Sequence, residues 1–179
     1  FLKKMNPPDG IPYKLLTYPY GEYVLSGSSV GVWVAAIDKS YGKAEITEPI
    51  YYSVESDNTT VGQAVINNDG YATLYGDGDV YFSAVTGEAY GSTMLHSVSN
   101  PDSIVIKNES DGSEVSSLSV SSGQTVYLTA DSVYQNINLT DSDEAYSWSV
   151  SDENLGTISA DGTFIPGNVS GTGTINVLS

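Results

Sequence analysis

Two acidic stretches contain the residue types that bind hard metal ions. The acids are Asp77 and Asp79 in GDGDV, and Asp141, Asp143 and Glu144 in DSDE. Calcium takes about six to eight oxygen ligands from carboxylates and carbonyls. Neither stretch has EF-hand spacing, and Thr172 and Thr174 replace the first two acids in the repeat described below. We therefore interpret these acids as solvated turn charges, and we predict no metal ion and no other cofactor.

Acid–base and nucleophilic catalysis need a second kind of constellation. Glycoside hydrolysis uses two carboxyl groups facing each other across a cleft, whereas most of the 22 acids here fall in turns. The single histidine, His96, lies in STMLHSVS, where we interpret it as a structural or interdomain residue. Sequence order leaves a triad open, but no spacing indicates one. No cysteine is present, so thiolate chemistry and disulfides are excluded. We predict that the chain is not an enzyme.

Aromatic residues are the stronger candidates for ligand contact. The chain has 14 Tyr and 2 Trp, and sugar rings stack on exposed flat aromatic side chains. Trp33 lies between Val32 and Val34, so its side chain should face away from the core. The candidate binding residues are Trp33, Tyr18, Tyr20 and Tyr23, the tyrosines coming from YKLLTYPYGEY. The alternative is that these tyrosines cover sandwich edges or pack at a joint between domains. We assign the other tryptophan, Trp148, to a core.

The charge of the chain excludes several partners. Net charge is −16, from six lysines and no arginine against 22 acids. Such a surface does not neutralise phosphates, so nucleic acid is excluded as a partner, and docking on anionic lipid is disfavoured. No apolar run reaches membrane-spanning length, so we predict no membrane insertion. The high like charge discourages association, and we expect a monomer.

Two copies of one unit position these residues. SGSSVGVWVAA (26–36) matches SGQTVYLTA (122–130), pairing Val30 with Val126 and Val32 with Leu128. The further matches are 52–58 with 148–154, 64–73 with 156–165, and 76–84 with 171–179. Apolar residues at every second position predict strands with one buried face. Recurrent Asp-Gly turns between short strands predict an all-β sandwich or barrel.

The repeat also predicts the domain boundaries. Residues 1–10 are expected to be a leader or linker, 11–99 a first sandwich and 100–179 a second, with the break at Asn100-Pro101. The start at Phe1 predicts a fragment of a longer protein or a processed chain. In WSVSDENLGTISADGTF (148–164), Trp148 and Val150 share one strand face. Residues 152–154 form a loop, and Asp161-Gly162 turns the next strand back toward Phe164.

The pattern from Trp148 to Ile175, W-S-V-S-D-x-x-x-G-T-I-S-x-D-G-T-F followed by G-T-G-T-I, resembles bacterial immunoglobulin-like domains of group 2. The first copy departs from it, with Tyr52 in place of the tryptophan. The resemblance implies two tandem immunoglobulin-like antiparallel β-sandwiches, of a kind that serve as stalks, spacers or adhesive modules in bacterial surface and secreted proteins. AAIDKSYGK and LGTISADGTF are more loosely similar to tails of large secreted carbohydrate-active enzymes, including bacterial phosphodiester glycosidases.

Three hypotheses about function remain. The leading one is a non-catalytic spacer module of a larger bacterial protein, secreted or displayed on the cell surface. The rival is a carbohydrate- or host-surface-binding module that contacts polysaccharide or a surface glycan through exposed aromatics. An enzyme acting on a phosphodiester or glycoside is the weakest reading.

Overall fold

The computed structural model describes residues 7–55 and 63–179, and within them the protein is all-β. Part of the expected leader, residues 1–6, lies outside the described residues. The chain divides into two compact units. Unit 1 comprises Phe1–Glu22 and Ser29–Ser97, and unit 2 comprises Tyr23–Ser28 and Val98–Ser179.

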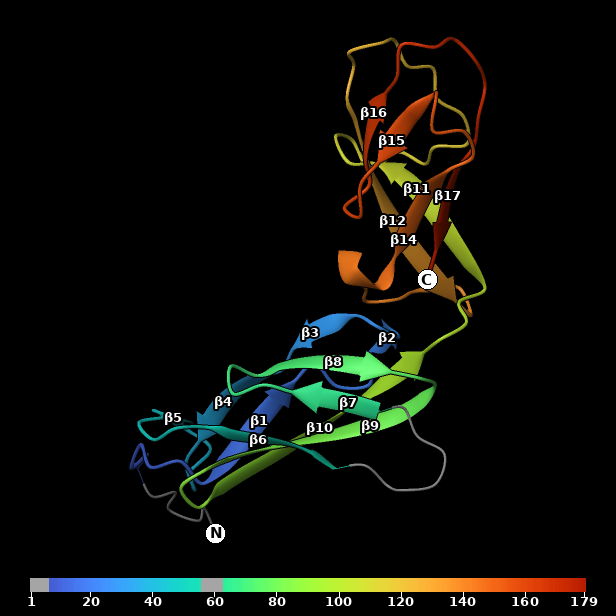
Figure 1. The fold of residues 1–179 in the computed structure, drawn as a ribbon. Helices are drawn as coiled ribbons and strands as arrows, with labels where there is room; N and C mark the ends of the chain where they lie inside the picture. The colour runs from blue at the N-terminus through green and yellow to red at the C-terminus, as the bar shows by residue number, and fades with distance from the viewer. Residues whose placement is uncertain (1–6, 56–62) are drawn as a thin grey trace. The chain divides into compact units, whose positions relative to one another are not determined.

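Unit 1 is built from two sheets. The larger sheet has the strand order β5-β4-β1-β10-β9-β6, and a short sheet β3-β8-β7 lies over it (Figure 1). The strands are β1 (Lys14–Tyr18), β3 (Ser29–Gly31), β4 (Trp33–Ile37), β5 (Lys43–Ala44), β6 (Tyr51–Glu55), β7 (Gln63–Ile66), β8 (Tyr71–Tyr75), β9 (Gly78–Thr86) and β10 (Ala89–Val98). Pairing of β4, β9 and β6 in this sheet is antiparallel, whereas β1 runs parallel to β10 at Lys14↔Tyr90.

The core of unit 1 follows from the alternation of its strands. Leu15, Ala36 and Ala84 face inward from the larger sheet, with Tyr52 partly buried against them. Opposite them the short sheet contributes Leu74, which is fully buried. Alternate residues of the same strands therefore face solvent.

Unit 2 repeats this plan with different pairing. Its sheets have the strand orders β11-β12-β16-β15 and β14-β17. The elements are β2 (Tyr23–Leu25), β11 (Ser103–Asn108), β12 (Val126–Tyr134), β13 (Ile137–Asn138), the 3₁₀ turn η1 (Asp143–Ala145), β14 (Ser147–Val150), β15 (Gly156–Ile158), β16 (Thr163–Pro166) and β17 (Ile175–Leu178). Trp148 is partly buried and packs against two core clusters, as expected of a core residue.

The two hairpins β7–β8 and β15–β16 are structurally equivalent, as the repeat predicts. The Val32 N–H donates to the Gly70 carbonyl at 2.7 Å, and the Leu128 N–H donates to the Gly162 carbonyl at 3.1 Å. Both glycines have positive φ, 82° and 81°. A Cβ added to Gly70 would lie 2.9 Å from the Tyr52 ring, and one added to Gly162 would lie 3.4 Å from the Trp148 ring. The motif-like stretch 148–164 is therefore a strand whose aromatic ring covers a tight turn.

The segment Tyr23–Ser28 departs from simple tandem order. We expected it inside a first sandwich of residues 11–99, but the structure groups it with unit 2. Leu25 has no exposed surface and packs with a cluster that includes Leu139 and Tyr146. Its N–H donates to the Thr140 carbonyl at 2.9 Å, and the Thr140 N–H donates back to the Tyr23 carbonyl at 2.8 Å. Unit 2 therefore depends on residues distant in sequence.

Candidate aromatic binding surface

One face of the larger sheet in unit 1 exposes large apolar side chains, and we call it the aromatic face. Its members are between 36% and 69% exposed. They are Leu16 and Tyr18 on β1, Trp33 on β4, Tyr51 on β6, Tyr81 and Val85 on β9, and Tyr90 on β10.

Strand register places these residues on the same side of the sheet. Residues directly opposite each other on paired strands share a face. Tyr18 lies opposite Trp33, and Tyr90 lies opposite Val85, which itself lies opposite Tyr51. The pairing Lys14↔Tyr90 joins the two halves, because Lys14 and Tyr18 point to the same side of β1.

Trp33 is held at one end of this face. Its side chain is exposed, as its position between Val32 and Val34 predicts. The ring of Tyr71, on β8, approaches it edge-on, with centroids 6.4 Å apart and an interplanar angle of 72°. Gly31 leaves room for the indole, since a Cβ there would lie 3.3 Å from the ring. The indole is therefore oriented before any ligand arrives, which lowers the entropic cost of binding.

The candidate tyrosines fall into two groups. Tyr18 is exposed beside Trp33, and its hydroxyl donates to the Glu22 carboxylate at 3.1 Å, which raises the pKa of Tyr18. Tyr20 is 71% exposed in the turn that follows β1. Tyr23, by contrast, belongs to unit 2, where it packs against the core with its ring centroid 6.0 Å from that of Tyr134. Tyr23 is therefore not placed on the aromatic face.

Polar groups are interspersed among the rings. The hydroxyls of Ser53 and Ser83 are 2.6 Å apart in the middle of the face. The Tyr90 hydroxyl donates to the Glu55 carboxylate at 3.4 Å. The face thus offers both apolar ring surfaces and hydroxyl groups able to form hydrogen bonds. The members on β6, β9 and β10 were missed from the sequence, although Tyr81 between Val80 and Phe82 has the same alternation as Trp33.

The acids and the histidine singled out from the sequence lie apart from this face or have partners of their own. His96 lies opposite Asp79 in the β9–β10 ladder, and its Nδ1 is 2.5 Å from the Asp79 carboxylate. Within residues 7–55 and 63–179, no group of three or more His, Cys, Asp or Glu side chains is arranged to hold a metal ion.

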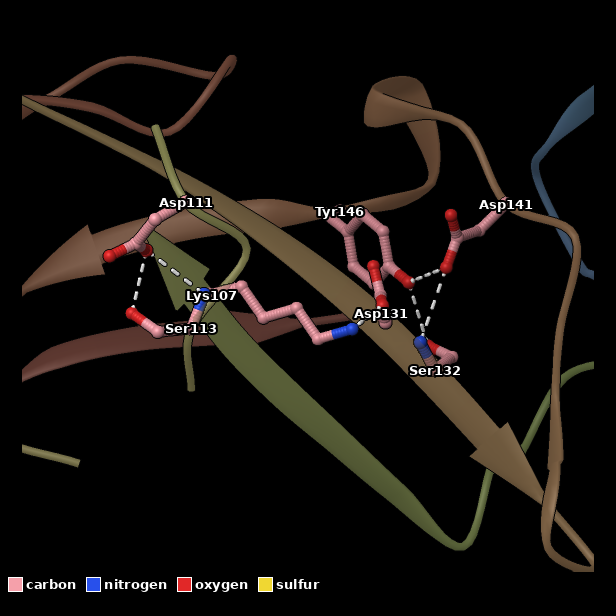
Figure 2. Close-up of polar contacts among 7 residues, drawn as sticks. All are labelled: Lys107, Asp111, Ser113, Asp131, Ser132, Asp141 and Tyr146. Atoms are coloured by element: carbon pink, nitrogen blue, oxygen red, sulfur yellow. Dashed lines mark hydrogen bonds and ion pairs between the residues drawn. The ribbon is translucent and has the colours of Figure 1, made fainter. Parts of the chain in front are cut away.

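Asp141 belongs to a partly buried network in unit 2 (Figure 2). Its Oδ2 accepts the Tyr146 hydroxyl at 2.5 Å and the Ser132 N–H at 3.2 Å. The Ser132 and Tyr146 hydroxyls are 2.8 Å apart. Burial raises the pKa of Asp141, and burial together with the Asp141 hydrogen bond raises the pKa of Tyr146. These contacts tie η1 and the preceding loop to β12, so we assign Asp141 a structural role.

Lys107 and Asp131 form an ion pair on the neighbouring strands β11 and β12 (Figure 2). The hydrogen bond with Asp131 raises the pKa of Lys107, which keeps the amine protonated. The side chains of both residues remain partly exposed, 27% and 35%. A protonated, partly solvated amine is a poor nucleophile, and an exposed ion pair of this kind stabilises a fold only slightly.

The two substitutions Asp141→Ala and Asp141→Asn are expected to act differently. Alanine leaves the Tyr146 hydroxyl and the Ser132 N–H without their acceptor and should cost about 1–3 kcal/mol of unfolding free energy. Asparagine keeps an acceptor oxygen and removes the charge, so it should be much milder at neutral pH. Urea unfolding followed by Trp148 emission measures both.

The effect of Asp141→Asn should also depend on pH. Because the pKa of Asp141 is raised in the folded chain, the unfolded chain releases this proton at lower pH than the folded chain. The stabilisation from the proton is complete below the ordinary Asp range and is lost as pH rises through the raised value. Relative to wild type, Asp141→Asn should therefore gain stability between acidic and neutral pH. A pH-independent difference would contradict this assignment.

Comparisons with known proteins give fold likenesses alone. No protein-family model matches this chain, and no curated protein sequence matches it. Domains 4–9 of the surface-layer protein SbsC align at 18% identity over 93% of this chain and 29% of that chain, with a TM-score of 0.43. Domains 5–6 of SbsC align at 16% identity over 93% of this chain and 90% of that one, with a TM-score of 0.44.

The human protocadherin-24 EC1-2 structure aligns at 11% identity over 88% of this chain and 80% of that one, with a TM-score of 0.36. This chain therefore spans less than a third of the domains 4–9 structure and most of the other two. Likenesses this weak assign no ligand, partner or activity to the chain. In the part of the chain that the structure describes, no helix has the length and apolarity needed to cross a membrane.

Proposed function

We propose that this chain is a non-catalytic extracellular module that binds a polysaccharide or cell-surface glycan through the aromatic face of unit 1. The observation that carries the proposal is the strand register that gathers Trp33, Tyr18, Tyr81, Tyr90 and Tyr51 on one exposed sheet face. Monomeric soluble proteins seldom expose contiguous apolar patches of large extent unless the patch has a function.

The chemistry of the face suits a saccharide. Tyrosine and tryptophan rings present flat apolar surfaces to the C–H faces of a sugar, and the tyrosine and serine hydroxyls can bond its hydroxyl groups. Adjacent strands are about 4.8 Å apart, so rings on successive strands form a row that can follow an extended chain. With a net charge of −16 the protein repels polyanions, which favours an uncharged glycan.

The spacer role is the second candidate. It is supported by the two repeated units, whose hairpins share the same hydrogen bonds and glycine conformations. A stalk of group 2 immunoglobulin-like modules in a secreted or surface-displayed bacterial protein would carry such units. The two roles are compatible, because a spacer unit can also present a binding face.

Binding is tested by calorimetric titration of the full chain with uncharged plant, host and cell-wall polysaccharides. Trp33→Ala and Tyr18→Ala should each weaken binding by about 2- to 10-fold, the range expected for one aromatic contact. The matched control is Tyr127→Ala, which removes an exposed tyrosine from β12 of unit 2. Both face substitutions are at exposed positions, so stability should change little.

Two results would overturn the proposal. Binding to none of these glycans would leave the spacer role as the better account. Saturable binding weakened as much by Tyr127→Ala as by Trp33→Ala would place the site elsewhere.

A further inference from the structure

The two units differ at one strand position. In unit 1, β10 lies between β1 and β9 and joins β5-β4-β1 to β9-β6 in a single sheet. The equivalent strands of unit 2 are β11–β12 and β14–β17, because β14 pairs with β17 as β6 pairs with β9. These strands form two separate pieces of sheet, and no strand among the described residues lies between them.

The edge of β17 away from β14 is therefore available for pairing. The Ser151 N–H donates to the Thr174 carbonyl at 2.9 Å across the β14–β17 ladder. Backbone groups alternate sides along an antiparallel strand, so those of Asn176 also point to β14. The N–H and C=O groups of Ile175 and Val177 point to the opposite edge, where β9 in unit 1 pairs with β10.

On the other side of this opening, β11 is covered over half its length. The Asn108 N–H donates to the Ser113 carbonyl at 2.9 Å, and the Val115 N–H donates to the Ile106 carbonyl at 2.8 Å. The first half of β11, residues 103–105, has no such cover among the described residues. Ile104 there is only partly buried, and Leu178 on β17 is 66% exposed. Strand β10 fills the corresponding position in unit 1.

The occupant can be read from β10. That strand runs antiparallel to β9 and parallel to β1. It turns small or apolar residues inward at every second position: Ala89, Gly91, Thr93, Leu95 and Ser97, all buried. We propose that the open edge of β17 accepts an extended polypeptide strand of this pattern from outside the described residues. The strand would run antiparallel to β17 and parallel to β11, and its main chain would bond to Ile175 and Val177. Addition of a strand to an open sheet edge is a recurring mode of peptide recognition.

The test uses a fluorescent synthetic peptide with the sequence of residues 88–99, EAYGSTMLHSVS, and the full chain. Anisotropy should show saturable binding, and amide hydrogen exchange at Ile175 and Val177 should slow when the peptide is present. A control peptide carrying Thr93→Pro has the wrong backbone for a strand and should not bind.

A variant of the chain tests the same hydrogen bonds from the other side. Val177→Pro removes an N–H that faces the open edge and leaves the β14 ladder bonds in place, so peptide binding should be lost. Trp148 lies opposite Val177, and its emission reports whether this variant remains folded. The control peptide with wild-type chain keeps the test valid if the variant does not fold.

Three results would overturn the proposal. The first is absence of binding by the wild-type chain, and the second is equal binding of the two peptides. The third is concentration-dependent protection of Ile175 and Val177 without peptide, because the edge would then pair with a second copy of the chain. None of these results bears on glycan binding by unit 1.

Discussion

Leu25→Ala is expected to destabilise unit 2 by about 2–5 kcal/mol, the range for deleting a fully buried leucine side chain. Leu25 is 0% exposed and packs with Val98, Ala130, Leu139 and Tyr146, all of which belong to unit 2. The residue lies early in the chain, yet its loss should be felt in the second half. Urea unfolding of a Trp33→Phe background isolates Trp148 emission as the reporter of unit 2.

The matched control is Leu15→Ala, which deletes an equally buried leucine from the core of unit 1. It should leave the Trp148 transition unchanged, because its partners Ala36 and Ala84 belong to unit 1. A Trp148 transition that is unaffected by Leu25→Ala would contradict the assignment of residues 23–28 to unit 2.

Gly162→Ala is expected to cost unit 2 about 3 kcal/mol or more, since two separate penalties combine. At φ +81° an alanine is strained by about 1–2 kcal/mol. Its Cβ would also lie 2.1 Å from the Leu128 carbonyl oxygen, a backbone atom that moves only with strand β12. Relief of this clash would break the hydrogen bond from the Leu128 N–H to the Gly162 carbonyl.

Gly123→Ala separates the two penalties. Gly123 has φ +82°, and a Cβ there meets nothing within 4 Å, so this variant carries the backbone strain alone. The Trp148 unfolding transition should shift clearly less for Gly123→Ala than for Gly162→Ala. Equal shifts would mean that the close approach of the turn to β12 contributes nothing.

Much of the fold could be predicted from local sequence. Alternating apolar residues and the Asp-Gly turns predicted an all-β chain with repeated hairpins, and the alignment of Val32 with Leu128 is confirmed by their equivalent hydrogen bonds to Gly70 and Gly162. The replacement of tryptophan by Tyr52 is also explained, because both rings cover the hairpin glycine. These features depend on neighbours within a few residues or on one strand's period of two.

The candidate site could be predicted only in part. The exposure of Trp33 follows from its position between two valines, which is a property of a single strand. Its company on the aromatic face depends on which strands pair and in what register. Tyr51, Tyr81 and Tyr90 join it through β10 and β9, whereas Tyr23, close to Tyr18 in sequence, is placed in unit 2.

By itself, the sequence determined the strand pattern, the turns, the repeat and the charge that excludes polyanionic partners. Only the tertiary structure decided that residues 23–28 complete unit 2, that seven side chains form one aromatic face, and that β17 has an edge where β9 has a partner. The reason is physical. A strand's alternation fixes which residues are apolar, but backbone hydrogen bonds are alike along every strand, so long-range packing selects the partner.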